Sequence, residues 1–177
     1  MEVQADEYGG GRADRIHAEL FARALTGLGL DRRYGSYLDS LPAVTLATVN
    51  LMSLFGLHRR LRGAIVGHLA LFEMTSSIPN ARYARALRRL GFDDDTVEFF
   101  DEHVEADAVH ENLAAVDLAG GLVRQEPELG PQVLWGARAL ALVDERWSRH
   151  VLDRWAGGES SLLTAAAAPT APAATAA

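Results

Sequence analysis

The stretch FFDEHVEADAVHE, residues 99–111, is the most informative part of the sequence. On an α-helix, offsets of four and seven residues fall within a sector of about 60°. His103, Asp107 and His110 therefore project from one face, spread along roughly 10 Å of helix axis. Glu105 points the opposite way, and Glu111 borders the face. Two imidazoles that flank a carboxylate predict a face able to bind two metal ions.

The same sequence would also be compatible with an acidic, solvent-facing helix that contains two histidines and binds no metal. Val104, Ala108 and Leu113 do not form a sufficient core stripe unless the polar face is also partly inside. The surrounding chain is hydrophobic and must bury this helix on most sides. Metal binding is therefore the favoured interpretation.

The sequence around this helix also has helical periodicity, which predicts an all-α fold arranged as a bundle. Asp93, Asp94 and Asp95 cap the long helix at its N-terminus, Gly29 ends the first helix, and Pro79 separates two others. The expected helices cover residues 12–28, 34–41, 42–54, 61–76, 80–90, 93–122 and 131–155.

One domain is expected over residues 1–156, followed by a disordered Ala/Pro/Thr-rich tail over residues 157–177. Residues 2–8 are expected to be the last turns of a helix whose beginning is absent. The chain is therefore interpreted as an N-terminally shortened version of a longer protein.

The amino-acid composition excludes several classes of function. The net charge of −7, with arginine as the only strongly basic residue, argues against nucleic-acid binding. The absence of cysteine excludes disulfides, thiolate metal sites and a cysteine nucleophile, so a metal must be held by His, Asp and Glu. Neither a signal peptide nor a membrane-spanning run is present, and a cytoplasmic location is expected.

Two further places offer ligands. Glu73 is an acid in the most apolar predicted helix, where it needs a metal or a cation such as Arg82 or Arg62. His17 follows Glu7 across a glycine-rich break that could bend the backbone around a site. A surface His17 with Asp14 as a helix cap would explain that segment equally well.

Together these residues supply three histidines and three carboxylates from several helices, as diiron bundle sites do. Six protein ligands leave positions open for O₂ and substrate. The set is Glu7, His17, Glu73, His103, Asp107 and His110.

The motifs DEYG (residues 6–9) with His17, FEMTS (residues 72–76) and DEHVEADAVHE (residues 101–111) resemble the iron-containing redox enzymes of the haem-oxygenase-like diiron oxidase superfamily. The resemblance covers residues 2–155. It implies a haem-oxygenase-like bundle, normally a homodimer, with a non-haem centre of two iron ions and O₂ as co-substrate. The implied ligands are the six above, with Asp14 as an additional candidate.

The resemblance therefore implies an oxidase or oxygenase that acts on a small organic molecule in secondary metabolism. The alternative is a metal-free helical module of the same fold that binds a ligand or dimerises. Haem oxygenase itself is disfavoured because it would leave His103, Asp107 and His110 without a role.

Overall fold

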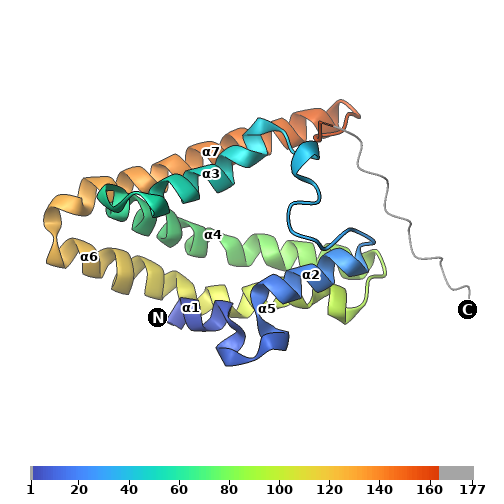
Figure 1. Cartoon of the computed structure of the whole chain (residues 1–177), viewed down its shortest axis with the longest axis horizontal. Coiled ribbons are helices and arrows are strands. Elements are labelled where there is room, and N and C mark those ends of the chain that lie inside the picture. Colours follow the sequence, from blue (N-terminus) through green and yellow to red (C-terminus); the bar gives the residue numbers. More distant parts are fainter. Residues whose placement is uncertain (1, 164–177) are drawn as a thin grey trace, which may run out of the picture.

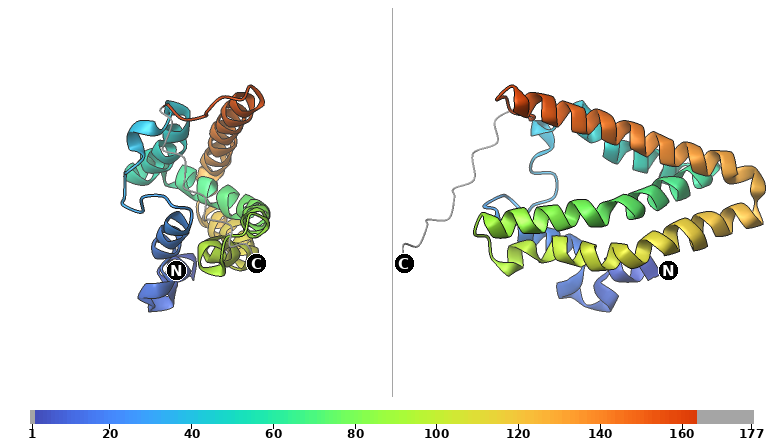
Figure 2. Two further views of the ribbon diagram at one scale, coloured as in Figure 1. Left: turned by 90° about the vertical axis from the view of Figure 1, so that its right-hand side faces the viewer. Right: turned by 180° about the vertical axis from the view of Figure 1, so that it is seen from behind.

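The computed structural model describes residues 2–163 and contains no β-strand within them, so the predicted all-α class is confirmed. Its long helical segments are α3 (Ala43–Leu57), α4 (Arg62–Arg89), α5 (Asp94–Asn112) and α7 (Gly130–Ala156). Helix α4 packs on one side against α5 and on the other against α3 and α7 (Figures 1 and 2). This central position places α4 and α5 side by side along most of their length.

Helix α5 begins as predicted. The side chain of Asp93 accepts a hydrogen bond from Thr96 N at 3.0 Å, which caps the first turn. The helix does not end in a simple α-helical stretch, because a π-helical segment, η5 (Leu113–Ala119), joins it to α6 (Gly120–Gln125). Such π-helical turns are frequent next to functional sites. The predicted long helix is therefore present, but its second half is wound differently.

The predicted break at Pro79 is wrong, because α4 runs through this residue without interruption. Proline removes one backbone hydrogen bond and usually ends or kinks a helix. Here α4 is packed against α5 and α7 along both sides, and Asn80 Nδ2 donates to the Ser76 carbonyl at 3.0 Å. Tertiary packing outweighs the local preference, so Glu73 and Ser76 belong to one long helix.

The N-terminal segment folds back on itself. After α1 (Glu2–Glu7) come two short 3₁₀ turns, η1 (Gly9–Gly11) and η2 (Ala13–Arg15), before α2 (His17–Gly27). The first turn has positive φ angles at all three glycines, and a Cβ on Gly9 would lie 2.6 Å from the Arg15 carbonyl carbon. A helix beginning at residue 12 was therefore a wrong prediction. The reversal brings the end of α1 next to the start of α2.

Helix α2 ends as predicted at Gly29, whose φ of 72° allows the two closing hydrogen bonds Gly29 N to Thr26 O (2.9 Å) and Leu30 N to Leu25 O (2.8 Å). The short helix expected over residues 34–41 is reduced to the 3₁₀ turn η3 (Leu38–Ser40). Thus the chain between α2 and α3 is mostly irregular.

The start of the predicted tail is attached to the bundle. Leu163 N donates to Ser40 O at 2.9 Å, and the His150 ring contacts Ser161 O at 3.0 Å. The rest of the predicted tail, residues 164–177, lies outside the described residues. Within residues 2–163, no helix is long and apolar enough to cross a membrane.

Close backbone packing joins α4 to α7 and gives a first prediction. Gly67→Ala is expected to lower the free energy of unfolding by about 1–3 kcal/mol, because its new Cβ would overlap the Val133 carbonyl. Urea denaturation measures the change. Gly56→Ala in α3 is the matched control, since no atom lies within 4 Å of the added Cβ. It is expected to be neutral or stabilising by up to about 1 kcal/mol.

Candidate metal centre

The six residues predicted as ligands come together in two groups of three. The first group joins Glu7 of α1, His17 of α2 and His103 of α5. The second group joins Glu73 of α4 to two residues of α5, Asp107 and His110. Within each group, one potential ligand atom from every residue lies within 4.8 Å of the others. Helix α5 contributes to both groups, as its sequence pattern predicts.

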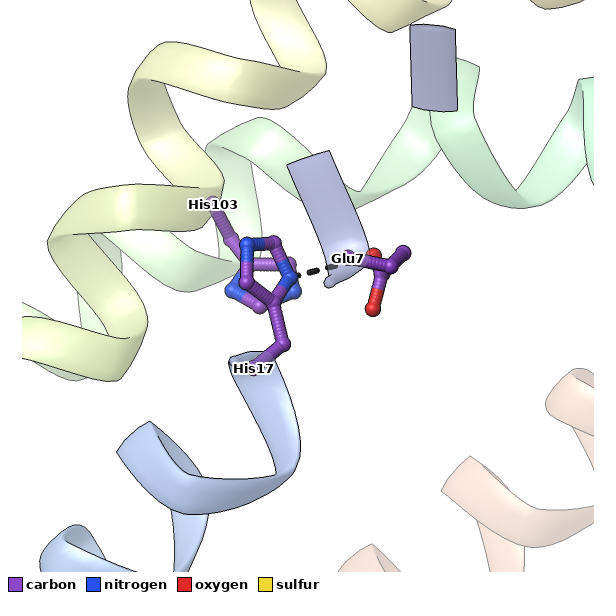
Figure 3. Close-up of side chains that lie close together, drawn as sticks. All are labelled: Glu7, His17 and His103. Atoms are coloured by element: carbon purple, nitrogen blue, oxygen red, sulfur yellow. Dashed lines mark ion pairs between the residues drawn. The ribbon is translucent and has the colours of Figure 1, made fainter. Parts of the chain in front are cut away.

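In the first group two imidazoles and a carboxylate face one another (Figure 3). The His17 and His103 ring centres are 4.5 Å apart, and Glu7 Oε1 lies 3.1 Å from His17 Nδ1. That contact lacks hydrogen-bond geometry, so both buried ring nitrogens of His17 have no hydrogen-bond partner among the described residues. His103 Nδ1 lies 2.7 Å from the Phe99 carbonyl, which can only accept, so Nδ1 donates and Nε2 keeps a free lone pair.

The second group is more deeply buried. Glu73, Asp107 and His110 expose 6%, 3% and 1% of their surface, respectively. His110 Nδ1 lies 3.4 Å from Glu73 Oε2 and 3.8 Å from Asp107 Oδ1, and it has no hydrogen-bond partner within residues 2–163. Ser76 Oγ donates a hydrogen bond to Asp107 Oδ2, so the other oxygen of Asp107 is the one that faces His110.

The two buried carboxylates of Glu73 and Asp107 lie close together, and their negative charges repel each other. Burial, followed by the negative charge of Asp107, raises the pKa of Glu73 to about 7, and Glu7 adds to this effect. Burial lowers the pKa of His110, but the Asp6 hydrogen bond and the charges of Glu73 and Asp107 outweigh it, so the net shift is upward. The group favours added positive charge, which a divalent metal would supply.

Arg62 and His68, which lie near Glu73 in the sequence, have partners outside the two groups. Arg62, one suggested partner of Glu73, pairs with Glu126 instead. His68 is buried but belongs to neither group, as its position on the helix predicts. Its ring packs against the rings of Phe55 and Phe72, with centres 6.2 and 6.4 Å away.

Asp14, the additional candidate ligand, lies outside both groups. Its exposed carboxylate pairs with Arg12 at 2.8 Å. The neighbouring Arg15 has a different role, because it pairs with Glu98 at 2.6 Å and also with Glu102. These ion pairs fasten the start of α2 to α5 and so hold His17 opposite His103.

Two residues that contact the predicted ligands were not assigned a role from the sequence. Ser76 holds Asp107, and Asp6 Oδ2 lies 2.9 Å from His110 Nε2. Asp6 belongs to the DEYG motif and Ser76 to the FEMTS motif. Their partners could not be identified from spacing, because Asp6 and His110 are 104 residues apart.

The chain matches a known protein family over most of its length. The family model described as "iron-containing redox enzyme" matches residues 1–145, which include both groups. The chain belongs to this family. No individual curated protein matches the chain. Family membership confirms the predicted haem-oxygenase-like bundle and identifies the chain as an iron-dependent oxidoreductase.

The residues present in this iron-containing redox enzyme fit iron. Imidazole nitrogens and carboxylate oxygens are its ordinary ligands in non-haem sites. The buried nitrogens of His17 and His110 that lack a hydrogen-bond partner among the described residues also favour a bound metal. A buried polar atom without a partner costs about 1–3 kcal/mol of folding stability. An ion at each group would give one of these nitrogens in each ring a partner.

Proposed function

We propose that this chain is a non-haem diiron enzyme that uses O₂ to oxidise a small organic molecule. The observation that carries the proposal is the pairing of two three-residue groups on a shared helix, α5, each with a buried imidazole nitrogen that lacks a partner. Glu7, His17 and His103 would hold one ion, and Glu73, Asp107 and His110 the other.

In this proposal the two groups hold the ions close together, leave coordination positions free and limit access of water. Iron ions held by these residues would supply the electrons that reduce O₂. The protein keeps the groups close, since the charge of Glu7 in one group affects Glu73 in the other. Three ligands per group leave coordination positions free for O₂ and substrate. Burial of the second group limits access of water to it.

A pocket next to the first group is suited to the substrate. Its volume is about 720 Å³, within the usual range for small-molecule sites, and Glu7 is part of its wall. Most of the lining is apolar and comes from α1, the turn after it, α4 and the π-helical segment: Val3, Tyr8, Leu69, Leu113, Ala114 and Leu118. These walls support a substrate with a hydrophobic body. Secondary metabolism, a homodimer and a cytoplasmic location remain predictions from the sequence.

Anaerobic loading with ferrous iron tests the proposal directly. The protein should retain about two iron ions per chain after desalting, and exposure to air-saturated buffer should consume about one O₂ for every two ferrous ions oxidised. Free ferrous iron at the same concentration is the control. Retention of no iron would contradict the proposal and favour the metal-free helical module. Retention of a single ion would contradict the diiron assignment.

A further inference from the structure

Adjacent residues of α1 contact different metal groups. Glu7 lies 3.1 Å from His17 in the first group, while the preceding residue, Asp6, lies 2.9 Å from His110 in the second. Asp6 is not one of the ligand candidates, because its carboxylate is on the far side of the His110 ring from Glu73 and Asp107. Helix α1 is therefore attached to both groups at once.

The His110 ring lies between the Asp6 carboxylate on one side and the carboxylates of Glu73 and Asp107 on the other. Its Nε2 lies 2.9 Å from Asp6 Oδ2, whereas its Nδ1 faces Glu73 and Asp107. A neutral imidazole carries its proton on one nitrogen and a lone pair on the other. Carboxylates lie near both nitrogens, but within residues 2–163 only Nε2 is hydrogen-bonded, to Asp6. This hydrogen bond favours the proton on Nε2 and leaves the lone pair on Nδ1, the nitrogen that points into the group.

We infer that Asp6 is a positioning residue, which orients His110 and fixes its proton on Nε2 so that Nδ1 can bind metal. The inference rests on the proposed metal site. Carboxylates that accept a hydrogen bond from a metal-binding histidine serve this purpose in many metalloproteins, and their loss weakens metal affinity by about 10–100-fold. Asp6 acts on the second group, although it is next to a ligand of the first.

A double-mutant cycle separates this role from a structural one. In His17→Ala, which leaves only the second group intact, adding Asp6→Ala should weaken ferrous iron affinity by about 10–100-fold. In His110→Ala, which leaves only the first group, adding Asp6→Ala should have no effect. The affinities are measured anaerobically by competition with a chromophoric chelator. If Asp6 merely anchored α1, its loss would displace Glu7 and weaken the ion that remains in His110→Ala, which would overturn the inference.

Conservative variants and a spectroscopic measurement complete the test. Asp6→Asn keeps an oxygen that can accept from Nε2 and should retain most of the affinity that Asp6→Ala loses. Nitrogen-15 NMR of the Zn²⁺-loaded protein should show the His110 proton on Nε2 in the wild type and in Asp6→Asn. Glu2→Ala removes the same charge from α1 without touching either group, and it should leave both affinities unchanged.

The outcomes distinguish two kinds of failure. If the wild-type protein binds no iron or zinc, the proposed metal site itself is wrong. If it binds two ions and Asp6→Ala binds both with unchanged affinity, only the role of Asp6 is wrong. Proton placement on Nδ1 in the Zn²⁺-loaded wild type would also overturn that role.

Discussion

Replacing His110 with alanine is expected to remove one of two bound iron ions and to reduce O₂ consumption by at least about 10–100-fold. The reason is that His110 supplies the only nitrogen of the second group, and its loss leaves two adjacent buried carboxylates. Removing a ligand should cost at least as much as removing a hydrogen-bonding partner of a ligand, which costs about 10–100-fold in affinity or activity. Iron analysis after desalting and an oxygen electrode measure both effects.

His68→Ala is the matched control for this experiment. It also removes a buried imidazole, but His68 packs against aromatic rings and belongs to neither group. It is expected to lower the thermal stability and to keep both iron ions. Equal iron content in His110→Ala and the wild type would refute the assignment of His110 as a ligand.

Replacing Glu73 with glutamine is expected to stabilise the metal-free protein at pH 8 and to abolish metal binding at the second group. The pKa of Glu73 is raised to about 7, so the folded state binds a proton more tightly than the unfolded state, whose Glu pKa is about 4.5. The stability contributed by this group is full below about pH 4.5 and is lost as the pH rises to about 7. At pH 8 the ionised carboxylate therefore destabilises the metal-free fold.

Urea denaturation of the metal-free protein between pH 5 and pH 8 measures this effect. The wild type should lose stability across the interval, and Glu73→Gln should lose less. Adding ferrous iron at about 100 times its dissociation constant should stabilise the wild type by about 2.7 kcal/mol per ion, and the variant through one ion only. Glu105→Gln, an exposed carboxylate of α5, is the control and should behave as the wild type. Identical pH profiles for Glu73→Gln and the wild type would show that Glu73 does not carry this proton.

The proximity of the residues in the two candidate groups was the most predictable part of the molecule. A helix repeats with fixed geometry, so the spacing of His103, Asp107 and His110 predicts a common face without knowledge of the rest of the fold. A carboxylate among apolar neighbours, as at Glu73, similarly indicates a buried partner. The structure brings all six predicted residues into two groups, while their role as iron ligands remains a prediction.

Features that depend on long-range packing were not predictable in the same way. The continuation of α4 through Pro79 depends on the neighbouring helices α5 and α7, which local preference ignores. The 3₁₀ turns before His17 depend on the Gly9–Arg15 contact, and the contact of Asp6 with His110 spans most of the chain. The π-helical winding of Leu113–Ala119 has no recognisable sequence signal.

The glycine turn between α1 and α2 acts as a short tether. It keeps the Glu7 carboxylate within reach of His17, so Glu7 would stay at a high effective concentration next to an ion bound in the proposed site. The dependence on tether length is weak, since each doubling of a flexible loop costs only about 0.6 kcal/mol. The covalent link to α2 therefore keeps the end of α1 near His17 even when individual contacts of α1 open.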